Sequence, residues 1–170
     1  MRISLAFIVL VLSFESWALD CSRYQHATPR PSRYVLRGAQ VLDTRSHLSW
    51  QRCAVGQRFE HNHCLGSPKL MTLDEAQAAA SKSAQTWRVP TIQELASLIS
   101  PSCQPPMVNT TLFPDVVEMA EGKAKYWSSS PVKDMPMLTY NVDFIAGAID
   151  ANTAGIAMAV RWVRSQKMPR

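Results

Sequence analysis

One short segment of the chain carries the residue types of a metal site. His61, His63 and Cys64 lie close together, and imidazole and thiolate groups are common zinc ligands. A structural zinc site takes four ligands, yet no second cluster of histidine and cysteine lies nearby in the sequence. Oxygen ligands that could hold calcium are Asp143, Asp150 and Asn152. These three do not form the closely spaced acidic series of an EF-hand loop. We therefore expect neither a metal nor another cofactor.

A run of hydroxyl groups is the next candidate for chemistry. Ser128, Ser129 and Ser130 directly follow Trp127. They lack the Gly-x-Ser-x-Gly turn that presents the nucleophile of many hydrolases, and no serine, histidine and acid occur in a recognisable catalytic order. An aromatic ring beside hydroxyl groups instead suits the binding of a sugar. We therefore predict that Trp127, Ser128 and Ser129 bind a ligand.

Arg88 and Glu94 could be a catalytic acid and the cation that positions it. Glu94 also stands three residues after Thr91, however, where its side chain would complete a capping box at the start of a helix. An arginine near a helix start commonly forms an ion pair or contacts carbonyl groups. We therefore assign Arg88 and Glu94 to the fold, and we expect no enzyme activity.

Aromatic and basic side chains could recognise a glycan. Beyond the first residues, the tryptophans are Trp50, Trp87, Trp127 and Trp162. Large aromatic residues in strands are usually core residues. Trp127 is the best candidate for a sugar platform among them, because the three serine hydroxyls follow it. The end of the chain is basic, with Arg164, Lys167 and Arg170. We predict that these three contact a sulfated or phosphorylated polymer, with an ordinary solvated tail as the alternative.

The charge of the whole chain is compatible with such a partner. Lysine and arginine number 18 and acidic residues 13, which gives a net charge of +5. This mild excess suits an acidic glycan or an anionic surface, and a generic solvated surface is equally compatible with it. Arg161 lies inside a predicted strand, so we assign it to the fold. We expect no nucleic-acid partner.

Residues 1–18 have the pattern of a secretory signal peptide. Arg2 supplies a positive charge, residues 5–14 are almost all apolar, and Ser16-Trp17-Ala18 is a small-x-small cleavage site. The apolar run is too short for a bilayer span, which takes about 20 residues. The alternative is an uncleaved anchor or a buried helix. We expect cleavage after Ala18 and an exported mature chain without a transmembrane segment, located in the periplasm, on the cell surface or outside the cell.

All four cysteines lie beyond this signal, and an even number in an exported protein indicates disulfides. Three pairings of Cys21, Cys53, Cys64 and Cys103 are possible. Cys53 and Cys64 enclose a short polar stretch, residues 54–63, that we predict to be a loop. We therefore favour Cys53–Cys64, which leaves Cys21–Cys103 to tether the N-terminus.

The remaining chain has the length of one domain. We expect an extended lead-in over residues 19–33, a domain over 34–166 and a basic tail over 167–170. Strands are predicted at 34–36, 40–43, 47–52, 125–130, 139–144 and 156–164. Apolar residues alternate in the last two, which is typical of half-buried antiparallel strands. Capping boxes at Thr72–Glu75 and Thr91–Glu94 start two helices, and Asp43–Ser46 form a turn. The order of strands, helices and strands indicates an α+β fold.

Three segments together resemble a known family. They are residues 41–53, residues 87–95 with the run Trp-Arg-Val-Pro-Thr, and residues 126–130 with the closing 159–164. This combination is similar to the bacterial Lcl C-terminal domain family, a domain of unknown function named after a collagen-like surface adhesin, over about residues 34–164. The second segment is also similar to the formylglycine-generating-enzyme-like branch of the C-type lectin fold. The residues that we assign to this structural motif are Trp50, Trp87, Arg88, Pro90, Thr91, Glu94 and Arg161.

The resemblance implies a C-type-lectin-like fold, in which the first and last strands meet in one sheet. From the cysteine count, we expect this fold to contain two disulfides. It also implies adhesion, including the binding of sulfated polysaccharides. The chain has only six glycines and no Gly-x-y repeat, so it lacks the collagen-like stalk of the adhesin. A formylglycine-type oxidase would need a pair of reactive cysteines near the C-terminus, and no cysteine follows Cys103.

Three functions therefore compete. The first is an exported, non-catalytic module that binds a polyanionic glycan or an envelope protein. The second is a structural or accessory component of a surface appendage or envelope complex. The third is an enzyme on a formylglycine-generating-enzyme-like scaffold. The sequence leaves the ligand and the oligomeric state open.

Overall fold

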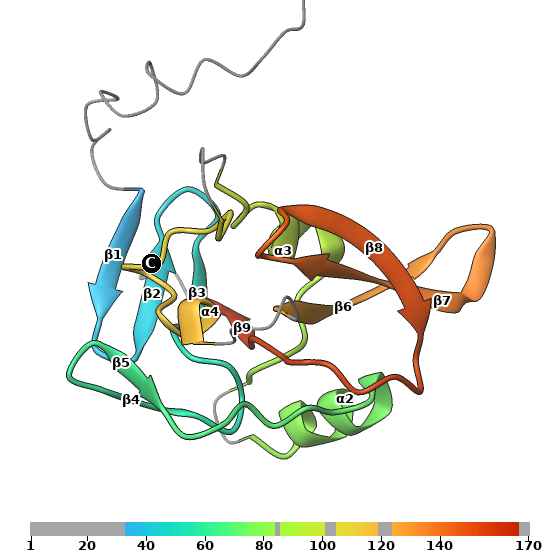
Figure 1. Cartoon of the computed structure of the whole chain (residues 1–170), viewed down its shortest axis with the longest axis horizontal. Helices are drawn as coiled ribbons and strands as arrows, with labels where there is room; N and C mark the ends of the chain where they lie inside the picture. Colours follow the sequence, from blue (N-terminus) through green and yellow to red (C-terminus); the bar gives the residue numbers. More distant parts are fainter. Residues whose placement is uncertain (1–32, 84–85, 101–104, 119–123, 167–170) are drawn as a thin grey trace, which may run out of the picture.

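The computed structural model describes residues 33–83, 86–100, 105–118 and 124–166 (Figure 1). One antiparallel sheet has the order β1-β2-β3-β9, and a second has the order β6-β7-β8. The strands of the first are β1 (Tyr34–Arg37), β2 (Gln40–Asp43), β3 (Leu48–Gln51) and β9 (Val163–Ser165). Those of the second are β6 (Lys125–Val132), β7 (Met135–Asp143) and β8 (Ala148–Thr153). A hairpin of β4 (Arg58–Glu60) and β5 (His63–Leu65) and the helices α2 (Leu73–Ser81), α3 (Ile92–Ala96) and α4 (Asp115–Glu118) complete the described elements. The fold is therefore α+β, as predicted.

The first and last described strands lie in the same sheet, because β9 pairs with β3. The predicted turn between β2 and β3 is confirmed. The Asp43 carboxylate accepts hydrogen bonds from the Arg45 backbone N–H at 3.0 Å and the Ser46 hydroxyl at 2.7 Å. These hydrogen bonds stabilise the turn and so fix the register of β2 against β3, in which Gln40 pairs with Gln51.

Both predicted capping boxes are formed. The Thr72 hydroxyl accepts from the Glu75 backbone N–H at the start of α2, and Thr91 does the same for Glu94 in α3. The Glu94 carboxylate also binds Arg88, with N–O distances of 2.7 and 2.6 Å. Glu94 therefore ties the α3 start to the strand-like segment that precedes it, which agrees with its assignment to the fold.

Substituting Glu94 with Gln is expected to lower stability at neutral pH by about 1 kcal/mol, because the charge-assisted cap and part of the ion pair are lost. Burial opposes ionisation of Glu94, but hydrogen bonds from Arg88 and the Thr91 backbone outweigh it and hold its pKa below the usual range. A carboxyl group with a lowered pKa stabilises the fold above its unfolded pKa, and this stabilisation is lost as the pH falls through the folded pKa. Urea unfolding from pH 7 down to pH 3 should therefore show a shallower acid loss for Glu94→Gln than for the natural protein.

The matched control is Glu75→Gln, which alters the exposed capping box of α2 and leaves the arginine pair intact. An equal acid profile for Glu94→Gln and the natural protein would show that the ion pair adds no stability.

The predicted antiparallel strand at 139–144 is confirmed within β7, although it is not buried on one face alone. The predicted strand at 156–164 is wrong in part. Within β7, Thr139, Asn141 and Val142 are all buried, so buried side chains lie on both faces of this strand. Its neighbour β8 was not predicted at all, since it is rich in alanine, aspartate and asparagine, which are poor strand formers.

Residues 158–162 do not form a continuous strand. Their backbone bonds in turn to Met71, Lys125 and Val55, and Trp162 accepts from Gln51. Only Val163–Ser165 pair in regular register as β9. This segment joins the two sheets, so both of its sides are buried, and the alternation of large and small residues follows packing rather than a solvent-facing surface.

Residues 54–63 were predicted to be a loop, and that prediction is also wrong in part. The chain forms the β4–β5 hairpin, which turns at His61 and Asn62, both with positive φ. The predicted Cys53–Cys64 disulfide closes the hairpin. The Cys21–Cys103 pair lies outside the described residues, so one of the two expected disulfides is seen.

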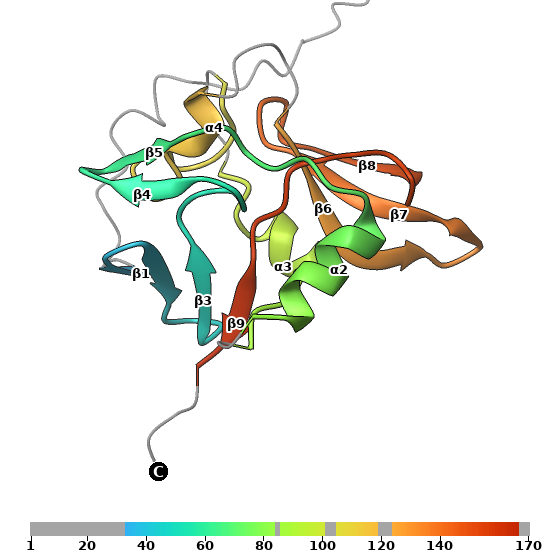
Figure 2. The ribbon, with the colours of Figure 1, turned by 90° about the horizontal axis from the view of Figure 1, so that it is seen from below.

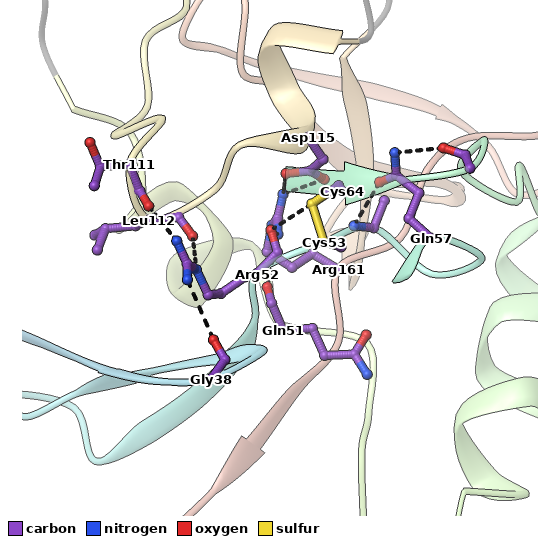
Figure 3. Close-up of a disulfide and its surroundings, with 12 residues drawn as sticks. Gly38, Gln51, Arg52, Cys53, Gln57, Cys64, Thr111, Leu112, Asp115 and Arg161 are labelled. Atoms are coloured by element: carbon purple, nitrogen blue, oxygen red, sulfur yellow. Dashed lines mark hydrogen bonds and ion pairs between the residues drawn. A yellow bond between two sulfur atoms is a disulfide. The ribbon is translucent and has the colours of Figure 1, made fainter. Parts of the chain in front are cut away.

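A buried ion pair anchors the core beside this disulfide (Figure 3). Arg161 and Asp115 are both fully buried, and one guanidinium nitrogen lies 2.6 and 2.7 Å from the two carboxylate oxygens. The other nitrogen donates to the carbonyls of Gln51 and Arg52. Tyr126 donates its hydroxyl to Asp115 at 2.6 Å, and burial raises the pKa of this tyrosine well above its ordinary value. Arg161 therefore joins the closing segment to β3 and α4, as its assignment to the fold requires.

Candidate binding site

A concavity of about 400 Å³ opens between the β1-β2-β3-β9 sheet, the β4–β5 hairpin and the residues just after α2. We call it the first concavity. Its size falls within the range of known ligand pockets, roughly 300 to 1,000 Å³. Three amide and three aromatic side chains contribute to its lining: Gln40, Gln51, Gln57, Phe59, Trp87 and Trp162. Figure 2 shows β3, which carries Gln51, and the β4–β5 hairpin, which carries Phe59.

The strand pairing explains why two of these amides lie together. Gln40 on β2 and Gln51 on β3 are direct partners, and paired residues on neighbouring strands share one face of the sheet. The Gln51 amide points away from the disulfide and the buried ion pair (Figure 3). Gln51 therefore presents one donor group and one acceptor group at the concavity.

The third amide is held in place by the hairpin. The Gln57 side chain accepts a hydrogen bond from the Ala54 backbone N–H at 3.2 Å and donates to the Gly66 carbonyl at 3.1 Å (Figure 3). The Cys53–Cys64 disulfide joins the two ends of the same loop, and Cys53 itself lines the concavity. This wall is thus fixed before any ligand arrives.

A cation lies at the edge of the first concavity. The Arg164 guanidinium lies over the Trp87 ring, 4.7 Å from the ring centre, and donates to the Gln40 side-chain oxygen at 3.0 Å. Among the described residues that line the concavity, none is an acid, a histidine or a free thiol. The arrangement offers hydrogen-bonding amides, aromatic surface and a positive charge, which together suit a hydroxyl-rich ligand with an acidic group.

A second concavity, of about 330 Å³, also has Trp87 in its lining. Gln77 and Ser81 of α2 contribute to its lining, together with Arg88 and Ser129. Trp87 contributes to the lining of both concavities.

The structure does not place the predicted ligand-binding residues Trp127, Ser128 and Ser129 together at one surface site. Trp127 is fully buried, and its indole N–H donates to the Met71 carbonyl at 3.0 Å. Ser128 is fully buried as well and donates to the Tyr140 carbonyl. Trp127 and Ser128 are therefore core residues and form no exposed sugar platform, which corrects the prediction from the sequence. Ser129 lines the second concavity.

The other predicted residues divide as follows. Trp50 lies in the core with no exposed surface, and Trp87 is buried as well, with 6% of its surface exposed. Pro90 is buried, and its carbonyl accepts from the Ser129 backbone. Arg164 lies beside the first concavity. Several predicted residues lie outside the described part of the chain, namely Cys103, the signal peptide with Cys21, and Lys167 and Arg170 of the basic tail.

The candidate metal ligands are already engaged or dispersed. Cys64 is in the disulfide, and His61 and His63 are exposed on the hairpin. Asp150 forms an ion pair with Lys125 at 2.8 Å, and Asn152 accepts from Asn141. No group of three or more histidine, cysteine or acidic side chains able to hold a metal occurs among the described residues. In this part of the chain, none of the helices has the length and apolar character needed to cross a membrane.

Sequence reasoning missed the glutamines and Phe59. The pairing of Gln40 with Gln51 could have been found, because the predicted turn at Asp43–Ser46 fixes their register. The contribution of Gln57 and Phe59 to the site could not have been found, since they lie in the stretch that was predicted to be a loop.

Comparison with known proteins gives a family. The family model described as the Lcl C-terminal domain matches residues 39–164, which cover most of the chain and include the residues that line both concavities. Comparison with curated proteins found no match. The chain therefore belongs to the Lcl C-terminal domain family.

Proposed function

We propose that this protein is an exported, non-catalytic module that binds a polyanionic glycan in the first concavity and acts in adhesion or recognition. The observation that carries the proposal is the lining itself, with three glutamines and three aromatic residues beside Arg164. Amides can donate to and accept from sugar hydroxyls at once. Aromatic faces cover the apolar faces of sugar rings, and a guanidinium binds carboxylate or sulfate groups.

Other features support the exported and lectin-like parts of this proposal. The Cys53–Cys64 disulfide is typical of proteins that work outside the reducing cytoplasm, which agrees with the signal peptide pattern. The first and last strands share one sheet, as a C-type-lectin-like fold requires. The net charge of +5 is compatible with an acidic partner.

A second candidate function is that of an accessory component of an envelope complex. The β6–β7 hairpin extends beyond the rest of the domain (Figure 1) and exposes two methionines near its tip, Met135 at 51% and Met137 at 73%. Flexible methionine side chains are frequent in surfaces that bind other proteins. Capture of one stoichiometric envelope protein that Met137→Ser abolishes would favour this function.

The glycan proposal predicts salt-sensitive retention of the protein on immobilised heparin. Gln51→Ala removes an amide that contacts the ligand, and Arg164→Gln removes the charge, so each is expected to weaken binding about fivefold. Retention of the natural protein should fall as salt screens the contact. Elution salt concentration and titration by surface plasmon resonance measure both effects.

Arg45→Gln is the matched control, because Arg45 is exposed in the turn at the opposite end of the β2–β3 hairpin. It removes the same charge and is expected to keep nearly full affinity. Absence of retention at low ionic strength would contradict a polyanionic ligand. Equal losses for Arg45→Gln and Arg164→Gln would place the contact outside the first concavity.

A further inference from the structure

The first strand, β1, has one backbone edge that pairs with no other strand of the described chain. It lies at the end of the sheet order β1-β2-β3-β9, with β2 on its inner side (Figure 1). The register with β2 is regular, and the Thr44 backbone N–H donates to the Arg33 carbonyl at 2.8 Å. Because bonded and non-bonded residues alternate along an antiparallel strand, the N–H and C=O groups of Tyr34 and Leu36 point away from β2. These main-chain groups are placed to pair with an added strand.

The side chains of β1 do not shield this edge. Proteins commonly protect edge strands with prolines, bulges or charged residues. The β1 strand has no proline and no shift in register, and its central residues Val35 and Leu36 are 40% and 48% exposed. An exposed apolar edge of this kind is typical of β-strand addition, in which an extended peptide joins the sheet.

A third concavity, of about 350 Å³, has a residue of this edge in its lining. Tyr34 contributes to its wall together with the apolar side chains Leu98, Ile99, Leu112 and Phe113, and polar residues complete it. In β-strand addition, main-chain hydrogen bonds give affinity and pockets for alternate side chains give specificity. A residue opposite Tyr34 on an added strand shares its face of the sheet, with the two Cβ atoms about 5 Å apart. An apolar side chain at that position is therefore placed at the third concavity.

The C-terminal end of β1 carries a positive charge. Arg37 is exposed, and its guanidinium has no hydrogen bond or ion pair with any described residue. Opposite charges on directly paired residues stabilise a sheet, whereas like charges destabilise it. Symmetric pairing of β1 with a second copy, with Tyr34 opposite Leu36, would place Arg37 opposite Arg33 of that copy. The charge therefore favours a partner with an acidic residue at this position over a second copy.

We infer that β1 is a docking edge for an extended segment of a partner protein, which adds to the sheet as an antiparallel strand. An acidic residue of the segment pairs with Arg37, and an apolar residue falls opposite Leu36. A second apolar residue falls opposite Tyr34 and enters the third concavity. The antiparallel direction continues that of the whole β1-β2-β3-β9 sheet. The inference goes beyond the proposed function and does not rest on it.

A capped peptide of sequence Thr-Glu-Val-Thr-Phe-Thr tests the docking edge by NMR with the ¹⁵N-labelled protein. In the antiparallel register its glutamate falls opposite Arg37, its valine opposite Leu36 and its phenylalanine opposite Tyr34. The Tyr34 and Leu36 amides are expected to shift and to exchange more slowly with solvent when the peptide is added. The amides of Val35 and Arg37 face β2 and should keep their exchange rates, so they serve as internal controls.

The matched control peptide has the same sequence with N-methyl groups on its valine and phenylalanine. It cannot donate to the Leu36 and Tyr34 carbonyls, and the loss of these hydrogen bonds should weaken binding at least about tenfold. Binding of the methylated peptide as tight as that of the parent peptide would overturn the docking edge. No shift of the Tyr34 and Leu36 amides with the parent peptide would overturn it as well.

A charge reversal tests the direction of the added strand. Arg37→Glu is expected to weaken binding of the peptide about fivefold and to strengthen binding of the peptide in which lysine replaces glutamate. Lys133→Glu makes the same change of charge at an exposed residue between β6 and β7, and it should alter neither affinity. Equal effects of the two variants would contradict the pairing with Arg37. Slow exchange of the Tyr34 and Leu36 amides before any peptide is added would overturn the inference, because this chain or a second copy would already pair with the edge.

Discussion

Replacing Asp115 with asparagine is expected to lower the free energy of unfolding by about 3 to 5 kcal/mol, the range found when one partner of a buried ion pair is removed. Arg161 has no exposed surface, so the variant leaves a charged guanidinium in the core without its counter-charge. Burial alone would lower the pKa of Arg161, but the Asp115 charge and its hydrogen bonds raise it above the ordinary value. Arg161 therefore stays charged, and urea unfolding at neutral pH measures the loss.

The matched control is Asp150→Asn, which makes the same chemical change in the exposed Lys125–Asp150 pair, whose side chains are 37% and 51% exposed. Exposed pairs contribute less than about 1 kcal/mol, so this variant should unfold almost as the natural protein does. If Asp115→Asn does not fold, Tyr126→Phe removes one hydrogen bond to Asp115 and should cost about 1 kcal/mol. Near-natural stability of both Asp115→Asn and Tyr126→Phe would show that the ion pair does not anchor the core.

The second large effect is expected from replacing Cys53 and Cys64 together with alanine. The disulfide closes a loop with a sequence separation of 11, and such a loop loses about 3 kcal/mol of stabilisation when it is opened. Cys53 also lines the first concavity, so heparin binding should weaken in the folded variant. Urea unfolding and heparin retention measure the two effects on the same sample.

The control for this double substitution is Gln57→Ala, which breaks the side-chain bonds to Ala54 and Gly66 and keeps the disulfide. It should cost less stability than the loss of the disulfide. A double alanine variant with a free energy of unfolding within about 1 kcal/mol of the natural protein would contradict a structural role for the disulfide.

Features set by short-range chemistry could be predicted from the sequence. Thr72 and Thr91 with their glutamates mark both helix starts, and Asp43 marks the β2–β3 turn. The local Cys53–Cys64 pairing follows from the short polar segment between the two cysteines. Each of these depends on residues that are close in sequence, where side-chain hydrogen bonds and loop length decide the outcome.

Features set by tertiary contacts could not be predicted from the sequence. The β8 sequence has poor strand formers and pairs only because β7 offers it an edge. Residues 158–162 alternate as a strand does, yet both sides are buried between the two sheets. The candidate site also depends on tertiary contacts that the sequence does not reveal. Trp127 and Trp87 are both buried, and only the packing decides that Trp87, with 6% of its surface exposed, lies at the wall of two concavities.

The most direct test of the central claim is an NMR titration of the protein, labelled with ¹⁵N, with a heparin-derived oligosaccharide. Apart from Trp17 in the predicted signal peptide, the chain has four indole N–H groups, and each gives its own signal. Binding in the first concavity predicts shifts for Trp87, Trp162 and the Gln51 side-chain amide, while Trp50 and Trp127 stay in place as buried internal references. Shifts confined to other surfaces, or no shifts at low salt, would contradict the account.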